Sequence, residues 1–545
     1  MRMSCVGMDA VMPHEDALIL QSQPCTRRSF LAGGLLLLGS TVLFPASRQA
    51  ITSAAVAPNL SASDLDFASA LAAARAIRRG EVSSVALTTY IFARLERFNP
   101  QLNAVVTLSQ DEALARARAA DEAAARGEWW GPFHGVPCTI KDTFETAGVR
   151  TTAGAPSLTN HVPARDAVVV ARLRAAGAVI LGKTNVPLMA GDWQSYNDVF
   201  GTTNNPWDVA RTPGGSTGGG AAALAAGVTY LSVGSDIGGS IRVPAHFCGV
   251  YGHKPTLNVV PMRGHIPPPP GNPPSAPGFL AVAGPLARSA SDLKAALEVL
   301  GGPDTDEATA YRWSLPPARG TRLSDYRMGF VLDDPACPVS SEVGEALAAA
   351  VEALRKAGAN MEEGWPQGVN PAEQYDTYVY LLNSVFAFRL RDDRIEEVRQ
   401  RAANQDGTYQ AKQALAWTAP HKHFLAANSR RMAARAVWQQ YFRTHDAFLL
   451  PTAFVPAFPH DHSADFTNRV LATPKGPRPY LDLLFWISFV TLTGLPATTA
   501  PVGLTRDGLP VGIQIIGPYL EDATPIDLAG KLADVIGGFR PPKGY

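Results

Sequence analysis

Short apolar runs that alternate with helical stretches, from Gly131 onward, most constrain how this chain can fold. Apolar runs at 178–181 and 231–233 have the length of buried strands, whereas 167–176 and 219–226 have helical apolar spacing. Gly- and Pro-rich turns separate them. A chain with this alternation buries its strands in one sheet and packs its helices against it. The sequence therefore predicts an α/β fold, with a mixed, twisted β-sheet covered by helices on both faces.

The organisation along the chain predicts one large domain after an N-terminal leader. The chain has 545 residues, of which 46% are hydrophobic, enough for a large core. It has no internal repeat and no linker long enough to separate domains. We expect a leader over 1–57 and a single domain over 58–545, with its core at about 131–300 and 440–530. A variable helical segment is expected at about 305–440.

Charge is balanced over the chain. Lys and Arg total 48, Asp and Glu total 48, and the formal net charge is zero. Proteins whose main partner is nucleic acid or an anionic membrane usually carry excess positive charge. The balance removes the electrostatic reason to expect either, and we predict no nucleic-acid partner.

The leader has the parts of a twin-arginine export signal. Arg27 and Arg28 precede an apolar stretch at 31–45, and small residues follow up to Ala57. The stretch has about 15 residues, whereas a transmembrane helix needs about 20. We therefore expect passage through the twin-arginine export machinery, a periplasmic or secreted protein, and no stable membrane insertion after cleavage. An uncleaved N-terminal anchor is the alternative.

Lys141 belongs to the first of three segments that could carry chemistry, GVPCTIKD at 135–142. It stands at the end of an apolar run that predicts a buried strand. Because burial disfavours the ammonium form, such a lysine can be neutral and act as a base. Taken alone, a lysine at a strand end is more often solvated or paired with a carboxylate.

The second segment is glycine-rich, PGGSTGGGA at 213–221, and precedes an alanine-rich helical stretch. Its five glycines surround Ser216 and Thr217, and glycine lets the backbone approach a ligand closely. A phosphate-binding loop is one interpretation, but the Lys that its pattern requires is missing. A Rossmann fingerprint lacks a clear preceding strand. Taken alone, a flexible glycine turn is the simpler interpretation.

The third segment, SDIGGSIRVP at 235–244, places Ser240 after two glycines. A serine there can be held on a tight turn whose successive backbone N–H groups point at one spot. Such amides could hold a developing oxyanion. Taken alone, a β-turn with an exposed serine is the simpler interpretation.

Together the three segments resemble the amidase signature family of Ser-Ser-Lys hydrolases. The signature at 214–255 is nearly continuous, and the spacings from Lys141 to Ser216 and on to Ser240 are similar to the family's. The family includes fatty acid amide hydrolase, peptide amidase, mandelamide hydrolase and the A subunit of the glutamyl-tRNA amidotransferase. The resemblance covers about 65–300 and 440–530, and it implies a single amidase-signature domain.

The resemblance implies a role for each of these residues. Ser240 would be the nucleophile, Lys141 the neutral base, and Ser216 the bridge between them, held after a cis peptide bond from Gly215. Water would then hydrolyse the acyl-enzyme, and the chemistry implies no cofactor and no metal. The backbone amides implied for the oxyanion are those of Ile237, Gly238, Gly239 and Ser240.

Supporting roles follow for Gly215, Thr217, Asp236 and Arg242. Asp236 and Arg242 are expected to brace the turn by pairing with each other rather than to act on substrate. Thr217 stands where many relatives have a second serine, and its hydroxyl could still support the relay. Thr491 occupies a place that Asn often holds, so this position departs from the family's pattern.

Rival classes lack their motifs. The close His pairs, at 421–423 and 460–462, do not have the H-E-x-x-H spacing of a metal hydrolase. A Ser-His-Asp hydrolase would have G-x-S-x-G, and 238–242 lacks the final glycine. A non-catalytic binding protein would be expected to lose one of the three residues. An amidotransferase component needs tRNA and cytosolic partners, which the export signal disfavours.

The expected activity is hydrolysis of the C–N bond of a small-molecule amide, giving a carboxylic acid and ammonia or an amine. Within the family, an N-acyl amide, a peptide C-terminal amide, or a carbamate or ester are alternative substrates. The segments 193–196 and 375–388 and the proline-rich loop with His265 are expected to shape the pocket. Their rings favour an apolar or aryl acyl group, although the same rings could simply fill the core. Oligomeric state and natural substrate stay open.

Overall fold

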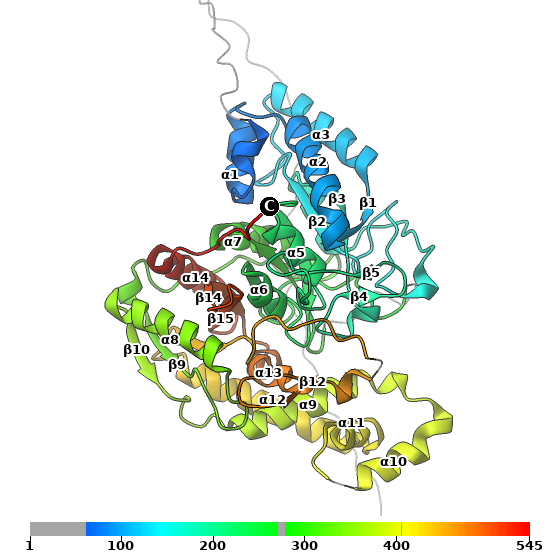
Figure 1. The fold of residues 1–545 in the computed structure, drawn as a ribbon, viewed down its shortest axis with the longest axis vertical. Helices are drawn as coiled ribbons and strands as arrows, with labels where there is room; N and C mark the ends of the chain where they lie inside the picture. Colours follow the sequence, from blue (N-terminus) through cyan, green and yellow to red (C-terminus); the bar gives the residue numbers. More distant parts are fainter. Residues whose placement is uncertain (1–60, 271–277, 405, 464) are drawn as a thin grey trace, which may run out of the picture. The chain divides into compact units, whose positions relative to one another are not determined.

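Eleven strands within the described residues form one mixed sheet (Figure 1). The neighbouring strands β2 and β6 are buried at every position, so both of their faces are covered by other parts of the chain. In sheet order the strands are β1 (Val105–Leu108), β3 (Val179–Thr184), β2 (Pro137–Lys141), β6 (Leu231–Asp236), β8 (Val282–Ala287), β7 (Tyr251–Lys254), β14 (Ala497–Leu504), β15 (Pro510–Ile516), β11 (Ala447–Pro451), β9 (Arg327–Phe330) and β10 (Asn360–Glu363).

The computed structural model describes residues 61–270, 278–404, 406–463 and 465–545. They belong to one unit that runs from Val56 to Tyr545. The predicted leader over 1–57 lies outside the described residues. Two short ribbons accompany the sheet, formed by β4 (Tyr196–Asn197) with β5 (Gly201–Thr202) and by β12 (Val470–Leu471) with β13 (Arg478–Pro479).

Helices cover both faces of the sheet, as predicted. In α13 every residue is buried, and a helix that is apolar all round belongs in a core. The α-helices of the described chain are α1 (Ala70–Arg78), α2 (Ser84–Leu102), α3 (Gln110–Ala125), α4 (Val168–Ala175), α5 (Gly218–Ala225), α6 (Arg242–Cys248), α7 (Ala290–Leu300), α8 (Ser341–Lys356), α9 (Pro371–Val385), α10 (Ile395–Ala403), α11 (Tyr409–Thr418), α12 (His421–Tyr441), α13 (Leu483–Thr493) and α14 (Ala523–Ile536).

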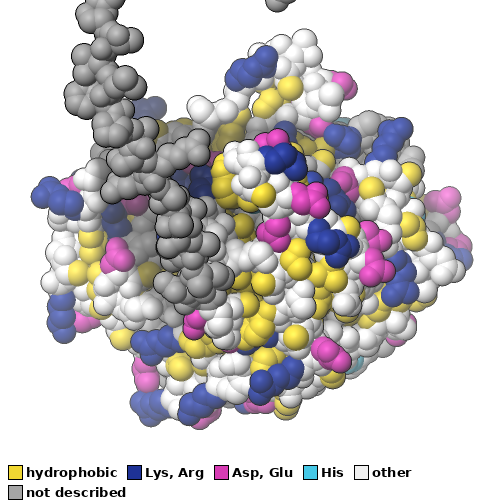
Figure 2. Space-filling model, turned by 90° about the horizontal axis from the view of Figure 1, so that it is seen from above, with side chains coloured by type: hydrophobic (Ala, Val, Ile, Leu, Met, Phe, Trp, Pro, Cys, Tyr) yellow, Lys and Arg dark blue, Asp and Glu magenta, His cyan; other side chains and the backbone are white. Residues whose placement is uncertain are grey.

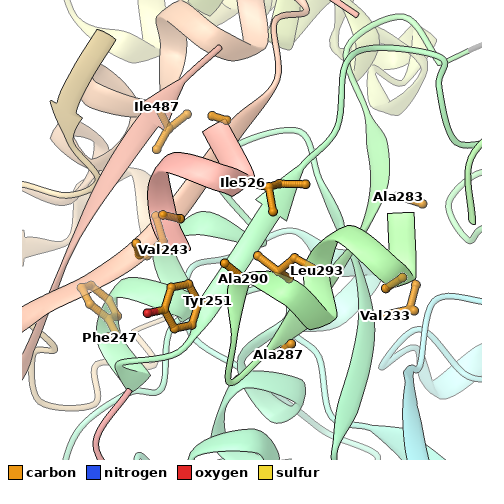
Figure 3. Close-up of a cluster of buried hydrophobic side chains, with 14 of the residues drawn as sticks. Val233, Val243, Phe247, Tyr251, Ala283, Ala287, Ala290, Leu293, Ile487 and Ile526 are labelled. Carbon is orange, nitrogen blue, oxygen red and sulfur yellow. The ribbon is translucent and has the colours of Figure 1, made fainter. Parts of the chain in front are cut away.

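The main core fixes the helix that follows the third sequence segment. Figure 3 shows Val243 and Phe247 of α6 in a buried hydrophobic cluster with Tyr251 of β7 and Ile487 of α13. A close-packed interior resists displacement of its parts. The turn between β6 and α6, which carries Ser240, is therefore anchored at both ends.

The sheet extends beyond the segments expected to form the core. Its strand β1 precedes residue 131, and β9 and β10 lie in the segment expected to be helical at 305–440. The strand β9 pairs in parallel with both β10 and β11. Strands β9 and β10 are each only four residues long, and β10 is largely exposed. Neither therefore gives a long apolar run in the sequence.

The surface has no dominant sign of charge on the face that Figure 2 presents, where Lys and Arg side chains are interspersed with Asp and Glu among the described residues. This agrees with the balanced composition of the chain. None of the helices in the described ranges combines the length and the apolar character needed to cross a membrane.

Candidate active site

Sheet topology brings the three predicted catalytic residues into one region. Lys141 ends β2, and Ser240 lies in the turn after β6. The two strands pair in parallel, and neighbouring parallel strands end at the same edge of a sheet. Ser216 lies just before α5, which packs against both strands. Residues far apart in sequence therefore converge at one sheet edge.

Lys141 contacts Ser216 directly. Its Nζ lies 2.8 Å from the Ser216 Oγ, and neither side chain is accessible beyond 1%. Burial lowers the pKa of Lys141 to about 7, although the nearby carboxylate of Asp236 acts in the opposite direction. The amine can therefore be neutral near neutral pH, which a general base requires.

A lowered pKa alone does not identify the base. Burial also lowers the pKa of Lys183 to about 8 and that of Lys254 to about 7. The Lys183 amine donates to Phe144 O and lies 3.6 Å from an Asp142 carboxylate oxygen. The Lys254 amine donates to two backbone carbonyl oxygens. The Lys183 amine also donates to a hydroxyl, that of Thr151. Of the three lysines, only Lys141 bonds a serine in the loop that contacts the Ser240 turn.

Ser240 lines a cavity of about 300 Å³. Its backbone oxygen accepts a hydrogen bond from the Thr217 amide at 3.2 Å, which fastens the Ser216 loop to the turn. Within the described residues, the Ser240 hydroxyl makes no hydrogen bond, and none joins it to the Ser216 hydroxyl. Two larger surface hollows, of about 670 and 540 Å³, contain none of the three catalytic candidates.

The turn at 237–240 has its carbonyl groups fixed on one side. The Tyr378 hydroxyl donates to Ile237 O at 2.9 Å, and the Trp193 indole donates to Gly238 O at 2.7 Å. Because the peptide unit is planar, fixing a trans carbonyl also fixes the direction of the next N–H. Gly239 has φ +85°, a conformation that favours glycine.

The amide of Gly239 differs from the prediction. It donates to Asp236 Oδ1 at 3.0 Å, so it is already occupied. The amides of Ile237, Gly238 and Ser240 have no acceptor within the described part of the chain. Three of the four predicted amides are therefore available to an oxyanion.

Asp236 and Arg242 pair with each other, as predicted. Their side chains are fully buried, with Arg242 Nη2 2.9 Å from Asp236 Oδ1 and Nε 3.1 Å from Oδ2. Burial by itself would raise the pKa of Asp236, but the Arg242 guanidinium and hydrogen bonds hold it below its ordinary value. Arg242 also donates to the Thr491 hydroxyl at 2.8 Å. Threonine at 491 therefore supports the brace.

The glycine-rich loop is packed too tightly for larger residues. The Gly215–Ser216 peptide bond is cis, as the resemblance implied. A Cβ on Gly215 would lie 2.5 Å from Asp192 O, closer than a real carbon can approach. The Thr217 hydroxyl donates to Ser235 O at 3.4 Å. Thr217 therefore contacts the neighbouring strand through its hydroxyl.

Aromatic side chains from distant segments form much of the cavity. The aromatic lining residues are Trp193, Phe386, Tyr409, Trp417 and Phe466. The segments 193–196 and 375–388 contribute, as predicted, whereas helix α11 and residues 466–484 were not expected.

The cavity is also largely uncharged. Within the described chain, Asp192 is the only charged residue that lines it. That carboxylate is neutralised by Arg469 Nη1 at 2.6 Å and accepts the Tyr480 hydroxyl at 2.5 Å.

Two polar residues near Lys141 have functional contacts that sequence reasoning did not assign. Ser235 contacts the Lys141 amine, and His265 contacts Ser235. His265 was expected in the pocket wall, but it is not among the lining residues of the cavity. In the described ranges, His, Cys, Asp and Glu form no group that could hold a metal ion.

Comparison with known proteins identifies the family of the chain. The family model described as Amidase matches residues 86–525. The chain belongs to the amidase signature family. Among curated relatives, the A subunit of the glutamyl-tRNA(Gln) amidotransferase of Roseiflexus sp. (strain RS-1) is 33% identical over 476 residues, which covers 83% of this chain and 93% of that protein.

Solved structures share the fold of this chain. One, from a study of a vestigial protein complex and the evolutionary origins of an s-triazine catabolic enzyme, has a TM-score of 0.71 at 28% identity, and the match covers 87% of this chain and 99% of that one. The 6-aminohexanoate cyclic dimer hydrolase has a TM-score of 0.68 at 25% identity, covering 88% and 99%. The predicted fold class, one amidase-signature domain, is confirmed.

Proposed function

We propose that this protein hydrolyses carboxamides to a carboxylic acid and ammonia or an amine. Ser240 is the nucleophile, Ser216 the proton bridge and Lys141 the base. One observation carries the proposal: the amine of a fully buried lysine lies 2.8 Å from a serine hydroxyl, beside a turn whose own serine lines a cavity. No cofactor enters the chemistry.

The reaction proceeds in two halves. The Ser240 oxygen attacks the amide carbonyl while its proton passes to Ser216 and the Ser216 proton passes to Lys141. The amides of Ile237, Gly238 and Ser240 hold the oxyanion. The ammonium then returns its proton through Ser216 to the leaving nitrogen as the C–N bond breaks. Water then attacks the acyl-enzyme while its proton passes through Ser216 to Lys141. The ester bond to Ser240 breaks, the proton returns through Ser216 to the Ser240 oxygen, and the acid leaves with Lys141 neutral again.

The relay requires Ser216 and Ser240 to come within hydrogen-bond reach. Catalytic hydrogen bonds are often long without substrate and shorten in the Michaelis complex. A rotation of the Ser240 side chain about its Cα–Cβ bond redirects its hydroxyl without moving the backbone. The Thr217–Ser240 backbone bond keeps the two loops together during that rotation.

The lining of the cavity supports a neutral substrate with an apolar or aryl acyl group. Rings surround much of the cavity, and the lining carboxylate of Asp192 is already paired with Arg469. The Asn383 Oδ1 accepts hydrogen bonds from Tyr409 and Gln413. A charged acyl group would lose its hydration there without gaining a partner of opposite charge.

Amidotransferase activity is the second candidate, because curated relatives at 33–34% identity are the A subunits of amidotransferases. Free glutamine carries an α-carboxylate and an α-ammonium group, and both need charged or strongly polar partners. The cavity, as far as the chain is described, offers neither a free cation nor an unpaired carboxylate. This favours a neutral amide over glutamine.

A labelling experiment tests the proposed chemistry. The protein is treated with a fluorophosphonate probe, and a panel of aryl and aliphatic amides, matching esters and glutamine is assayed for acid, amine or ammonia release. We expect labelling of Ser240 and turnover of neutral amides. Ser240→Ala should lose both, whereas Ser429→Ala, at an exposed position on α12, should retain both. Labelling that survives Ser240→Ala would reject the proposal, and turnover of glutamine alone would favour the second candidate.

We also propose that residues 1–57 direct twin-arginine export to the periplasm or the exterior. The support is the Arg27–Arg28 pair ahead of a short apolar stretch. Replacing both arginines by lysine should retain the protein in the cytoplasm, as measured by cell fractionation. Normal export of that variant would contradict the assignment.

A further inference from the structure

A chain of hydrogen bonds continues from Lys141 away from Ser216. The Lys141 Nζ lies 3.0 Å from Ser235 Oγ and 3.4 Å from Ser235 O. The Ser235 Oγ lies 2.9 Å from His265 Nε2, and His265 Nδ1 lies 3.1 Å from Pro267 O. The four groups therefore form one line from a backbone carbonyl to the proposed base.

The carbonyl oxygen of Pro267, at the end of this line, fixes which group donates and which accepts in each hydrogen bond between it and Lys141. A carbonyl oxygen can only accept, so the His265 Nδ1 carries the proton that it donates to Pro267 O. Burial lowers the pKa of His265 to about 3, and the neighbouring Lys141 acts in the same direction, so the ring is neutral. In a neutral imidazole the other nitrogen accepts. The Ser235 hydroxyl therefore donates to His265 Nε2.

Because the Ser235 hydroxyl donates to His265, its oxygen can only accept a hydrogen bond from Lys141. A hydroxyl has one proton, and Ser235 has given it to His265, so the Ser235 Oγ accepts from the amine. Ser235 O also accepts. A neutral amine has two N–H bonds and one lone pair, and both N–H bonds are used at Ser235. The lone pair is left for the Ser216 hydroxyl, the direction in which the proton must travel.

We propose that His265 is a positioning residue for the reaction: by holding the Ser235 hydroxyl, it turns the Lys141 lone pair toward Ser216. This rests on the proposed function, because it concerns the base of that reaction. His265 acts through Ser235 and touches neither the nucleophile nor the cavity. Without it, the Ser235 hydroxyl can donate to the Lys141 lone pair and compete with Ser216.

The backbone holds His265 in register with the strand that carries Lys141. His265 pairs with Phe144 in an isolated antiparallel bridge, and Ile266 N donates to Thr143 O at 2.7 Å. The imidazole meets the Phe144 ring edge-on, with centroids 4.9 Å apart. Because the segment after β2 supports the histidine, its distance from the base is set by the fold.

Few other charged or titratable groups face the amine. Asp236 at the end of β6 acts on Lys141 electrostatically and is paired with Arg242 of α6. Asp142, next along the chain, faces Lys183 of β3. A change in the pH profile after substitution of His265, with these groups intact, therefore reports the hydrogen-bond line.

The test compares three variants by their pH profiles for amide hydrolysis and for fluorophosphonate labelling of Ser240. His265→Phe keeps a ring against Phe144 and removes the acceptor. We expect kcat to fall about tenfold, the value of one hydrogen bond, with KM within about twofold of wild type. The acidic limb should move to lower pH, because a hydroxyl that donates to the lone pair favours the neutral amine. A purely structural role would not move that limb.

Ser235→Ala and the double variant decide whether His265 acts through Ser235. Ser235→Ala should also lower kcat and shift the acidic limb to lower pH, because the ammonium loses an acceptor. Adding His265→Phe to Ser235→Ala should change neither quantity further. Losses that multiply in the double variant would overturn the proposal. If His265→Phe does not fold, an unaltered profile in Ser235→Ala alone also overturns it.

A matched control and the wild type separate this inference from the proposed function. His161→Phe alters a half-buried histidine that pairs with Glu145, and it should leave the pH profile unchanged. If wild type hydrolyses amides and His265→Phe has the wild-type profile, only the inference fails. If wild type neither hydrolyses amides nor labels at Ser240, the proposed function fails and the inference fails with it.

Discussion

The pH dependence of catalysis should report the buried amine of Lys141. With its pKa lowered from 10.5 to about 7, about half of the amine is neutral at pH 7, compared with about one part in 3,000 for an ordinary lysine. At pH 5.5 only about 3% remains neutral. Because the neutral form is the base, kcat/KM should rise with pH and level off above about pH 8. Activity at pH 5.5 should be about thirtyfold below that plateau.

The assay is kcat/KM for a neutral amide from pH 5 to 9. Lys141→Arg should lower the plateau by about 10²–10⁴-fold, because arginine stays charged and cannot accept the proton. Lys254→Met provides a matched control, since Lys254 is equally buried with a similarly lowered pKa but bonds only to backbone carbonyls. That variant should keep the acidic limb. A profile flat to pH 5 in wild type, or a limb that disappears with Lys254, would refute the assignment of the base.

Three further outcomes follow from the contacts of the site. Arg242→Met should lower the free energy of unfolding by about 3–5 kcal/mol, because it leaves a buried carboxylate unpaired; urea denaturation measures this, and Arg506→Met, in an exposed ion pair, should leave the midpoint unchanged. Tyr378→Phe removes a donor to the oxyanion turn and should lower kcat/KM by about three- to tenfold; wild-type kinetics would show that the carbonyl needs no such support. Gln413→Glu places an unpaired carboxylate in the largely uncharged cavity and should raise KM for an aryl amide severalfold, whereas an unchanged KM would mean that the acyl group binds elsewhere.

The catalytic candidates were predictable from the resemblance of three segments to a known family, whereas some buried elements were predictable because burial leaves apolar runs in the sequence. Helix α13 is apolar at most positions since it is enclosed. Strand β6 is covered on both faces, but its only large apolar side chains are those of Leu231 and Val233. Strand β10, at the edge of the sheet, and its neighbour β9 were assigned to a helical segment. They are short and partly exposed, so they lack that pattern.

Hydrogen-bond direction and pocket composition could not be predicted. The Gly239 amide was assigned to the oxyanion, but the Asp236 carboxylate takes it, and nothing in the glycine pattern distinguishes the two uses. Trp417 of α11 enters the cavity from a segment with no recognisable motif. His265 was assigned to the pocket wall, and its contact with Ser235 joins positions 30 apart.

The sequence by itself indicated the α/β class and the family, because apolar runs and a glycine- and serine-rich signature are visible along the chain. Through that resemblance it also named the residues expected to act as base, bridge and nucleophile. Only the tertiary structure decided that the Lys141 side chain is buried and that it contacts both oxygens of Ser235. It also decided that the Gly239 amide, one of the four predicted for the oxyanion, donates to Asp236. Those properties depend on which groups contact one another at the edge of the sheet, and such contacts are set by packing rather than by spacing along the chain.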